Sequence, residues 1–279
     1  MHLRCRNRIL SLDRPAVMGV LNVTPDSFSD GGLWLDPRAA IKHALDMVAD
    51  GASIIDVGGE STRPGAAPVS LEEELRRVIP VIEELAVESD GAISIDTRKP
   101  DVARRAVDAG ACIINDTAGE IADPGMDVVV AETQAAAVVM HSRGTPETMR
   151  SLVQYGDVVG EVGSFLTRRA GELQRAGVPR DAIAIDPGFG FAKTPEHNLV
   201  LLNRIEELIG LGYPVVIGTS RKSFLGALLD LPESERVEGT AATVAWAVGR
   251  GAQIVRVHDV REMYRIVAVT EAIRDAGRG

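Results

Sequence analysis

Many of the short apolar runs in this sequence end in residues that can form hydrogen bonds or carry charge. These residues are Asn22, Asp56, Asp96, Asn115, His141, Asp186, Ser220 with Lys222, and Arg256 with His258. Taken singly, an Asp or Asn after a strand can be a turn residue or a helix N-cap, and His141 can be a histidine whose hydrogen bonds are satisfied at a rim. Helix capping does not explain why polar residues recur at the end of so many runs. The repetition predicts that these side chains line one pocket.

The stretch "VVIGTSRKSFLG" brings a hydroxyl and a cation to the end of a buried strand. Ser220 and Lys222 are followed by a predicted helix whose first backbone N–H groups favour an anion. Arg256 and His258 alternate along the last strand and so point to the same side. These residues, at the ends of the last two strands, are predicted to bind an anion. The stretch does not match GxSxG, because Lys222 replaces the second glycine, so Ser220 is not expected to be a nucleophile. Arg221 is expected to be a surface or dimer-contact residue.

Two long loops follow the first two strands. Asn22 precedes "VTPDSFSDGG" and Asp56 precedes "VGGESTRPGAAPV". Their glycines and prolines suit segments that close over a substrate. Arg63 lies between Thr62 and Pro64, which restrict its guanidinium; the alternative is an ordinary solvated loop arginine.

The elements that must position these residues alternate between strand and helix. The predicted strands are Val17–Val23, Ile54–Gly58, Ile93–Asp96, Ile113–Asn115, Val138–His141, Ile183–Asp186, Val215–Gly218 and Ile254–His258, and the predicted helices include Leu71–Leu85, Asp101–Ala109, Asp157–Ala176, His197–Ile209 and Val260–Asp275. Such alternation indicates a parallel sheet. Eight units favour a single-domain (β/α)₈ TIM barrel over residues 1–279, in which the first 14 residues or so form a short extension and the active site lies at the C-terminal ends of the strands. A doubly wound sheet is the alternative, but Gly188-Phe189-Gly190 fails the GxGxxG fingerprint because Lys193 stands at its last glycine.

Composition narrows the classes of function. The chain has 279 residues, 45% of them apolar, and a formal net charge of −10. This charge gives no reason to expect a nucleic-acid partner. Cys5 and Cys112 form no CxxC motif and are predicted to be ordinary thiols in a reducing compartment, the alternative being a disulfide. No apolar run reaches membrane-spanning length and no signal peptide is evident, so a cytoplasmic protein without membrane contact is expected.

Seven blocks of the sequence together resemble one enzyme family. They are "GVLNVTPDSFSDGG", "DVGGESTRPGA", "SIDT", "INDTAG", "DPGFGFAKTPEHN", "GTSRKSFLG" and "VRVHDV", in this order between residues 19 and 260. The chain resembles the dihydropteroate synthases in all of them. The resemblance implies a folate-pathway transferase that joins 6-hydroxymethyl-7,8-dihydropterin pyrophosphate to p-aminobenzoate, releases pyrophosphate and acts as a homodimer. The ordinary length of the "DPGFGFAKTPEHN" loop favours sensitivity to sulfonamides.

The resemblance also implies roles for individual residues. The pterin would be held by Asp96, Asn115, Met140, Asp186, Gly218 and Lys222, with Arg256 over one face of its ring; the p-aminobenzoate site would comprise Thr62, Arg63, Pro64, Phe191 and Ser220; Asn22, Arg63, Arg256 and His258 would bind pyrophosphate, and Asn22 would ligate Mg²⁺. Asp96, Lys222, Arg63 and Asp186 would be the catalytic residues.

The residue types agree with that chemistry. Carboxylates and a carboxamide can pair with the donors and acceptors along a pterin edge, and a wrong heterocycle would leave them unpaired at about 1–3 kcal/mol per group. Mg²⁺, Arg and His would neutralise the departing pyrophosphate. One rival is a pterin-binding methyltransferase domain, which would not need the first two loops or the anion corner. Another is a non-catalytic paralogue, which should have damaged loop motifs.

Overall fold

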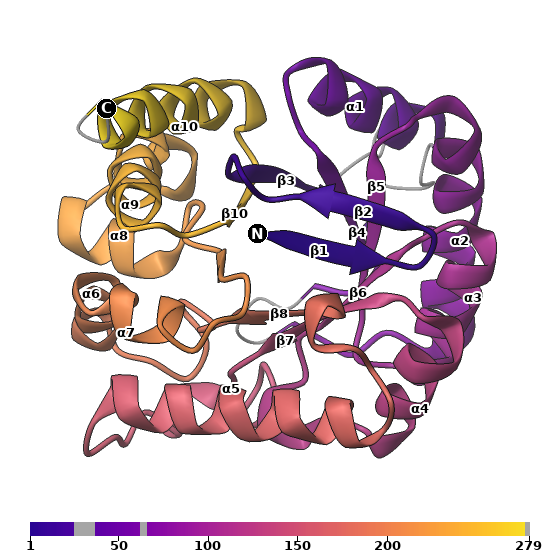
Figure 1. The fold of residues 1–279 in the computed structure, drawn as a ribbon, viewed down its shortest axis with the longest axis horizontal. Coiled ribbons are helices and arrows are strands. Elements are labelled where there is room, and N and C mark those ends of the chain that lie inside the picture. Colours follow the sequence, from indigo (N-terminus) through magenta and orange to yellow (C-terminus); the bar gives the residue numbers. More distant parts are fainter. Residues whose placement is uncertain (25–36, 62–65, 277–279) are drawn as a thin grey trace.

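The computed structural model describes residues 1–24, 37–61 and 66–276, which form a barrel of parallel strands inside a ring of helices (Figure 1). The eight barrel strands are β3 Ala16–Asn22, β4 Ile54–Gly58, β5 Ala92–Asp96, β6 Ile113–Asp116, β7 Ala136–Met140, β8 Ile183–Asp186, β9 Val216–Ile217 and β10 Ile254–Val257. They pair in the order β8-β7-β6-β5-β4-β3-β10-β9. A parallel bridge between Ile185 and Val215 joins β8 to β9 and closes the sheet. The predicted (β/α)₈ barrel is confirmed.

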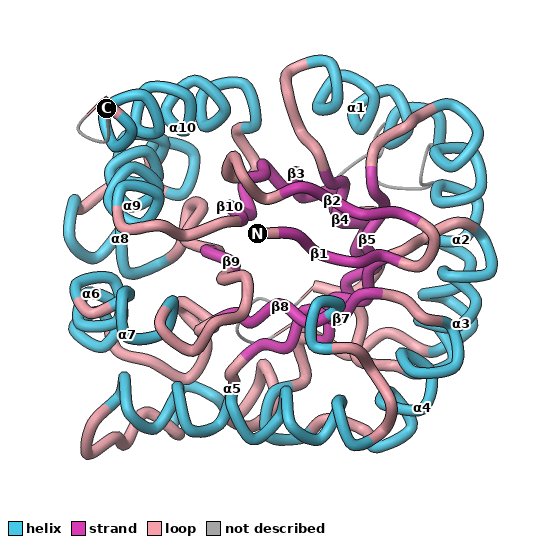
Figure 2. Tube along the Cα trace, in the orientation of Figure 1, coloured by secondary structure: helices cyan, strands magenta, loops and turns pink. Residues whose placement is uncertain are grey.

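Helices surround the strands, as the tube in Figure 2 shows. They are α1 Pro37–Ala49, α2 Leu71–Glu88, α3 Pro100–Ala109, α4 Pro124–Thr133, α5 Val158–Arg175, α6 Pro195–Asn203, α7 Ile205–Ile209, α8 Ser223–Leu229, α9 Val237–Gly249 and α10 Val260–Asp275, with short 3₁₀ helices at Gly119–Ile121, Met149–Ser151, Arg180–Ala182 and Glu233–Glu235. The local sequence explains where several of these helices begin. Ser70 caps α2 by accepting a hydrogen bond from the backbone N–H of Glu73, and Asp157 caps α5 in the same manner.

One predicted helix differs from the structure. Residues 197–209 were expected to form a single helix, but α6 begins at Pro195 and the backbone leaves helical geometry at Arg204, before α7. A capping box between Thr194 and His197 explains the earlier start. The predicted strand Val215–Gly218 is also shorter in the structure, where β9 spans Val216–Ile217.

Two apolar cores hold the barrel together. The larger core fills the space between the outer face of the sheet and the helices. The smaller core lies inside the barrel and includes Leu3, Cys5 and Leu12 of the N-terminal segment beside Met18 and Ile54 of the strands. The N-terminal residues that the sequence predicted as an extension form a hairpin, β1 His2–Cys5 with β2 Arg8–Ser11, which crosses one end of the barrel in Figure 1. The polar residues that follow the strands lie at the opposite end of the barrel.

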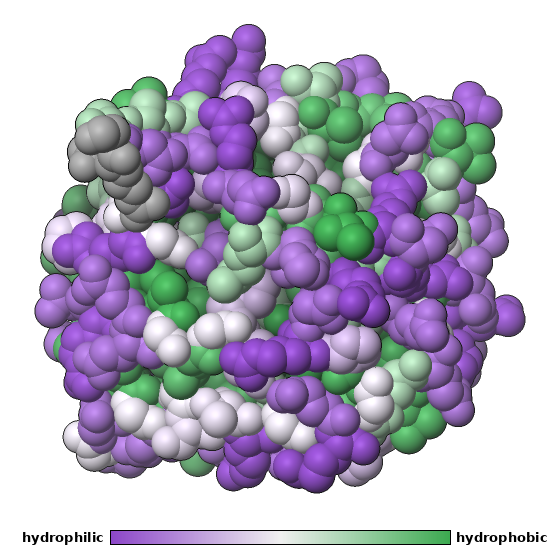
Figure 3. All heavy atoms as spheres, viewed as in Figure 1, coloured by the Kyte–Doolittle hydropathy of each residue, from purple (hydrophilic) through white to green (hydrophobic). Residues whose placement is uncertain are grey.

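The surface around the hairpin is mainly hydrophilic, and its apolar atoms form small separate patches (Figure 3). Within the described ranges, no helix combines the length and apolar character that a bilayer crossing requires.

Candidate active site

A cavity of about 850 Å³ opens at the C-terminal ends of the strands. Eight of the residues predicted from the sequence line it: Asn22, Asp96, Phe191, Gly218, Ser220, Lys222, Arg256 and His258. Asn115, Met140 and Asp186 are buried, with exposed fractions of 2%, 4% and 5%. Thr62, Arg63 and Pro64 lie outside the described residues. The structure thus gathers most of the predicted pocket from strands far apart in the chain.

A shared arginine organises the floor of this cavity. Arg256 Nε donates to Asp56 Oδ2 at 2.6 Å, and Arg256 Nη2 donates to Asp96 Oδ2 at 2.7 Å. Asp56 Oδ2 also accepts a hydrogen bond from Asn115 Nδ2 at 3.0 Å. Residues from β10, β4, β5 and β6 are therefore joined into one network before any ligand binds. We call Asp56, Asp96, Asn115, Asp186 and Arg256 the floor.

Sheet register explains why the floor residues meet. Asp96 pairs with Asn115 across β5 and β6, and Gly58 pairs with Asp96 across β4 and β5. Asp56, two residues before Gly58, faces the same side one layer deeper, opposite Ser94. The sequence marked Asp56 as a polar residue at a strand end but assigned it no role, and the structure shows that it holds Arg256 and Asn115.

Burial changes the protonation of the two other floor carboxyls. Desolvation raises the pKa of Asp96 to about 7, although the nearby Arg256 guanidinium opposes the shift. Burial also raises the pKa of Asp186, against the hydrogen bond that Asp186 Oδ1 accepts from the Gly188 backbone N–H at 2.7 Å. Because Asp56 and Asp96 share one arginine, the floor can retain a proton near neutral pH.

Lys222 lies between the floor and an aromatic ring. Its Nζ is 4.2 Å from the centroid of Phe191, and its positive charge opposes the raised pKa of Asp186. Gly190, beside Phe191, has a φ of +80°, and a Cβ there would lie 3.1 Å from Lys222 Cδ. Glycine thus permits both the backbone turn and the close approach of the lysine.

Ser220 and His258 form a second cluster, at the ends of β9 and β10. The Ser220 hydroxyl is 2.9 Å from His258 Nδ1 and accepts a hydrogen bond from the His258 backbone N–H at 3.1 Å. Burial lowers the pKa of His258 to about 3, and the charge of Arg256 contributes. Its imidazole is therefore a neutral hydrogen-bonding group at pH 7 in this structure, and its predicted role in binding pyrophosphate stays a prediction.

Arg221, which the sequence placed at the surface or in a dimer contact, has a side chain that is 33% exposed. It lines the cavity, and its Nε donates to Asp259 Oδ2 at 3.0 Å. Its φ of +55° turns the chain between β9 and α8. The Arg221–Asp259 ion pair fixes this turn beside the cavity. We call Ser220, Arg221, Lys222 and His258 the corner.

Two clusters to which the sequence analysis assigned no role hold the loops around the cavity. Lys193 is buried, and its Nζ lies 3.0 Å from His141 Nδ1, from the Gly188 carbonyl oxygen and from the Phe191 carbonyl oxygen. The hydrogen bonding of His141 is thus satisfied within the protein, which was the alternative to a role in the pocket. On the other side, Glu60 pairs with both Arg98 and Lys99, which joins the loops after β4 and β5.

The oxygen donors of the cavity fit Mg²⁺ at one point. Asn22 offers a neutral side-chain oxygen, the kind of hard donor that Mg²⁺ prefers. Asn22 Oδ1 lies near the Gly58 backbone on the same side as Asp96, since a Cβ on Gly58 would be 3.8 Å from Asn22 Oδ1 and 3.6 Å from Asp96 Cβ. In the described ranges, no three His, Cys, Asp or Glu side chains converge as metal ligands. A polyphosphate substrate and water would thus supply the remaining ligands.

A barrel with a preformed hydrogen-bonding floor and a cationic corner is the architecture of a pterin-binding enzyme. The family described as "Pterin binding enzyme" matches residues 18–258. The dihydropteroate synthase of Synechocystis is 50% identical over 261 residues, which cover 93% of this chain and 90% of that protein. The chain belongs to the dihydropteroate synthase family.

Solved structures agree with this family over the whole barrel. The Yersinia pestis dihydropteroate synthase with a sulfonamide drug complex is 44% identical, has a TM-score of 0.93, and is matched over 99% of this chain and 100% of that chain. The Xanthomonas albilineans dihydropteroate synthase in complex with 7,8-dihydropteroate is 42% identical with a TM-score of 0.89, over 98% of this chain and 99% of that chain. The chain is therefore a transferase of this family.

Proposed function

We propose that the cavity joins 6-hydroxymethyl-7,8-dihydropterin pyrophosphate to p-aminobenzoate and releases 7,8-dihydropteroate and pyrophosphate. The observation that carries the proposal is the convergence of Asp96, Arg256, Lys222 and Phe191 around one cavity at the strand ends, in front of the other, buried residues of the floor. The Xanthomonas relative with bound 7,8-dihydropteroate supports the same product. A pterin edge would meet Asp96, Asn115 and Asp186, and the ring acceptors would meet the Lys222 ammonium.

The chain's own residues would act mainly through charge and position. Departure of pyrophosphate leaves positive charge on the pterin methylene, and ionised Asp96 or Asp186 would stabilise it. The aniline nitrogen of p-aminobenzoate then attacks the methylene and loses a proton, so that a C–N bond replaces the C–O bond. His258 would donate a hydrogen bond to the leaving group while Ser220 fixes its ring. Mg²⁺, when bound through Asn22 and the substrate, would neutralise pyrophosphate oxygens.

Phe191 and Ser220 would line the p-aminobenzoate site together with Thr62, Arg63 and Pro64. The position of Phe191 under Lys222 places an apolar ring beside the pterin site, where the two substrates must meet. We expect a sulfonamide to compete with p-aminobenzoate here, a proposal supported by the Yersinia relative with its sulfonamide complex. We also propose a homodimer in the cytoplasm.

Pyrophosphate release with both substrates, with each alone, and with added chelator tests the proposal. Release should need both substrates and Mg²⁺, because Asn22 is a single neutral ligand and metal affinity should be weak without substrate. Pterin binding without pyrophosphate release would instead support a non-catalytic pterin-binding protein. Full activity in excess chelator would contradict the role of Mg²⁺ alone.

A further inference from the structure

The two cysteines of the chain meet at the end of the barrel remote from the active site. Cys5 is the last residue of β1, and Cys112 directly precedes β6. Both side chains belong to the smaller core under the N-terminal hairpin, with exposed fractions of 0% and 5%. Three βα units lie between Cys5 and Cys112 in the sequence. The hairpin, which crosses the end of the barrel, brings the two residues into the same core.

The two thiols lie close enough to influence each other. Their interaction raises the pKa of Cys5 and lowers the pKa of Cys112, while the Cys5 thiol itself donates a hydrogen bond to the Leu3 carbonyl oxygen at 3.5 Å. Burial opposes the shift at Cys112, while the positive charges of Arg8 and Arg6 support it. The surroundings make the two thiols unequal: Cys112 lines a cavity beside Arg6 and Arg8, whereas Cys5 is completely buried, so Cys112 is the accessible nucleophile.

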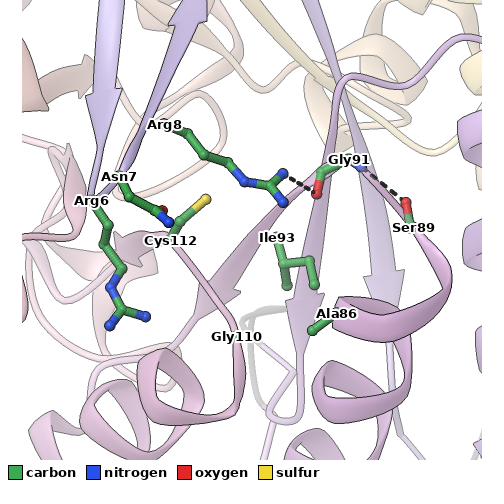
Figure 4. A pocket seen from close by; sticks show the side chains of 9 residues that line it. All are labelled: Arg6, Asn7, Arg8, Ala86, Ser89, Gly91, Ile93, Gly110 and Cys112. Carbon is green, nitrogen blue, oxygen red and sulfur yellow. Dashed lines mark hydrogen bonds between the residues drawn. The ribbon is translucent and has the colours of Figure 1, made fainter.

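A cavity of about 230 Å³ gives access to Cys112 (Figure 4). Its lining includes the exposed residues Arg6 and Asn7, in the turn of the hairpin, and Arg8, at the start of β2. Arg8 Nη1 donates to the Asp90 carbonyl oxygen at 2.7 Å, and Arg6 Nη1 donates to the Val107 carbonyl oxygen at 2.9 Å. These bonds hold both guanidinium groups at the cavity. A small neutral oxidant can enter the cavity and reach Cys112, and the two positive charges favour the thiolate form of Cys112.

We propose that Cys112 and Cys5 form a redox site at which a hydroperoxide converts the two thiols into a disulfide that fastens the hairpin to the barrel. The Cys112 thiolate attacks the distal peroxide oxygen, the O–O bond breaks, and an alkoxide or hydroxide leaves and takes up a proton. The resulting sulfenic acid is attacked by the Cys5 sulfur, and water leaves with the Cys5 proton. The sulfurs together lose two electrons, which the peroxide gains. Disulfides in a reducing compartment are typically transient and redox-sensing, as this site would be.

Oxidation of the 279-residue chain with hydrogen peroxide tests the proposal, because this chain has no other cysteine. After oxidation, denaturation and alkylation, the intact mass should fall by two hydrogens with no alkyl group added. Peptide mapping should find the Cys5 and Cys112 peptides crosslinked within one chain, and the melting temperature should rise and return after reduction. Two alkylated thiols after peroxide treatment, or a crosslink between two chains, would overturn the site; an unchanged melting temperature would overturn the fastening of the hairpin.

Two serine variants test the separate roles. Cys5→Ser keeps a hydroxyl that can donate to the Leu3 carbonyl oxygen, as the thiol does, but removes the resolving thiol, so peroxide should leave a sulfenic acid that dimedone labels. Cys112→Ser should be labelled at Cys5 at least tenfold more slowly. Equal labelling of the two variants would show that Cys112 is not the reactive thiol. Circular dichroism of both reduced variants confirms that they are folded.

Discussion

The floor and the corner of the active site differ in how their charges are held. In the floor, the side chains of Asp56 and Asp96 are 0% and 8% exposed and share Arg256, which is itself 18% exposed. In the corner, the Arg221 side chain is 33% exposed and His258 is neutral. Asp56 and Asp96 of the floor are paired with Arg256 without a ligand, while the corner lacks the full positive charge that a pyrophosphate needs.

The difference follows from what each region would bind. A pterin edge presents fixed donors and acceptors, so its partners gain from being preorganised by buried ion pairs. Pyrophosphate brings its own charge and metal, and its negative field would raise the pKa of His258 on binding. Substrate selection thus depends on the floor, and leaving-group stabilisation in the corner depends on the complex.

The largest effect should come from removing Asp56. In Asp56→Ala the partly buried Arg256 keeps one carboxylate partner and the buried Asn115 loses its acceptor, so we expect the free energy of unfolding to fall by about 3–5 kcal/mol. Urea denaturation measures this change, and calorimetric titration with a pterin should show weaker binding.

Asp259→Ala is the matched change in the corner. It breaks a more exposed ion pair with Arg221, and the expected loss is about 1 kcal/mol or less. Equal losses for the two variants would remove the distinction between floor and corner.

Lys222→Ala should have the next largest effect, on pterin binding. Asp186 would remain buried without the nearby ammonium, and we expect binding to weaken by roughly 2–4 kcal/mol. Arg221→Ala should weaken pterin binding much less. Ser220→Ala should raise the KM for p-aminobenzoate and leave pterin affinity unchanged. Isotherms for both ligands decide these points, and a larger pterin defect in Arg221→Ala than in Lys222→Ala would contradict the placement of the corner.

The sequence predicted the parts of the site that follow from barrel geometry. Parallel strands end on one face, so polar residues after buried runs had to converge, as Asp96, Asn115 and Asp186 do. The role of Asp56 could not be read in this way, because its partner Arg256 is 200 residues away and the pairing depends on strand order and register. The neutrality of His258 depends on its burial in the folded chain. Arg221 lines the cavity because the backbone has a positive φ at this residue, which the residue type does not predict.

A smaller effect is expected in the pH dependence of stability. The folded pKa of Asp96 is raised by burial from an ordinary value near 4 to about 7, so the folded state holds a proton that the unfolded state has released. The stability contributed by Asp96 is therefore full below pH 4 and is lost as the pH rises toward 7. Between pH 4 and 7 the free energy of unfolding should fall more steeply in the wild type than in Asp96→Asn. Parallel curves would show that Asp96 is already ionised through its ion pair with Arg256.

The smallest effect is expected for Ser94→Ala, which tests how far the floor extends into the barrel. Ser94 lies opposite Asp56 in the sheet, and its Oγ is buried, as is Asp56 Oδ1, without a hydrogen-bond partner among the described residues. Removing a hydroxyl that makes no bond leaves no partner unsatisfied, so Ser94→Ala should change the free energy of unfolding by about 1 kcal/mol or less, in the stabilising direction. If Ser94→Ala instead destabilises the protein by as much as a broken buried hydrogen bond, a water molecule must bridge Ser94 Oγ and Asp56 Oδ1. The floor would then extend one layer deeper into the barrel, and Asp56 would be held from below as well as by Arg256 and Asn115.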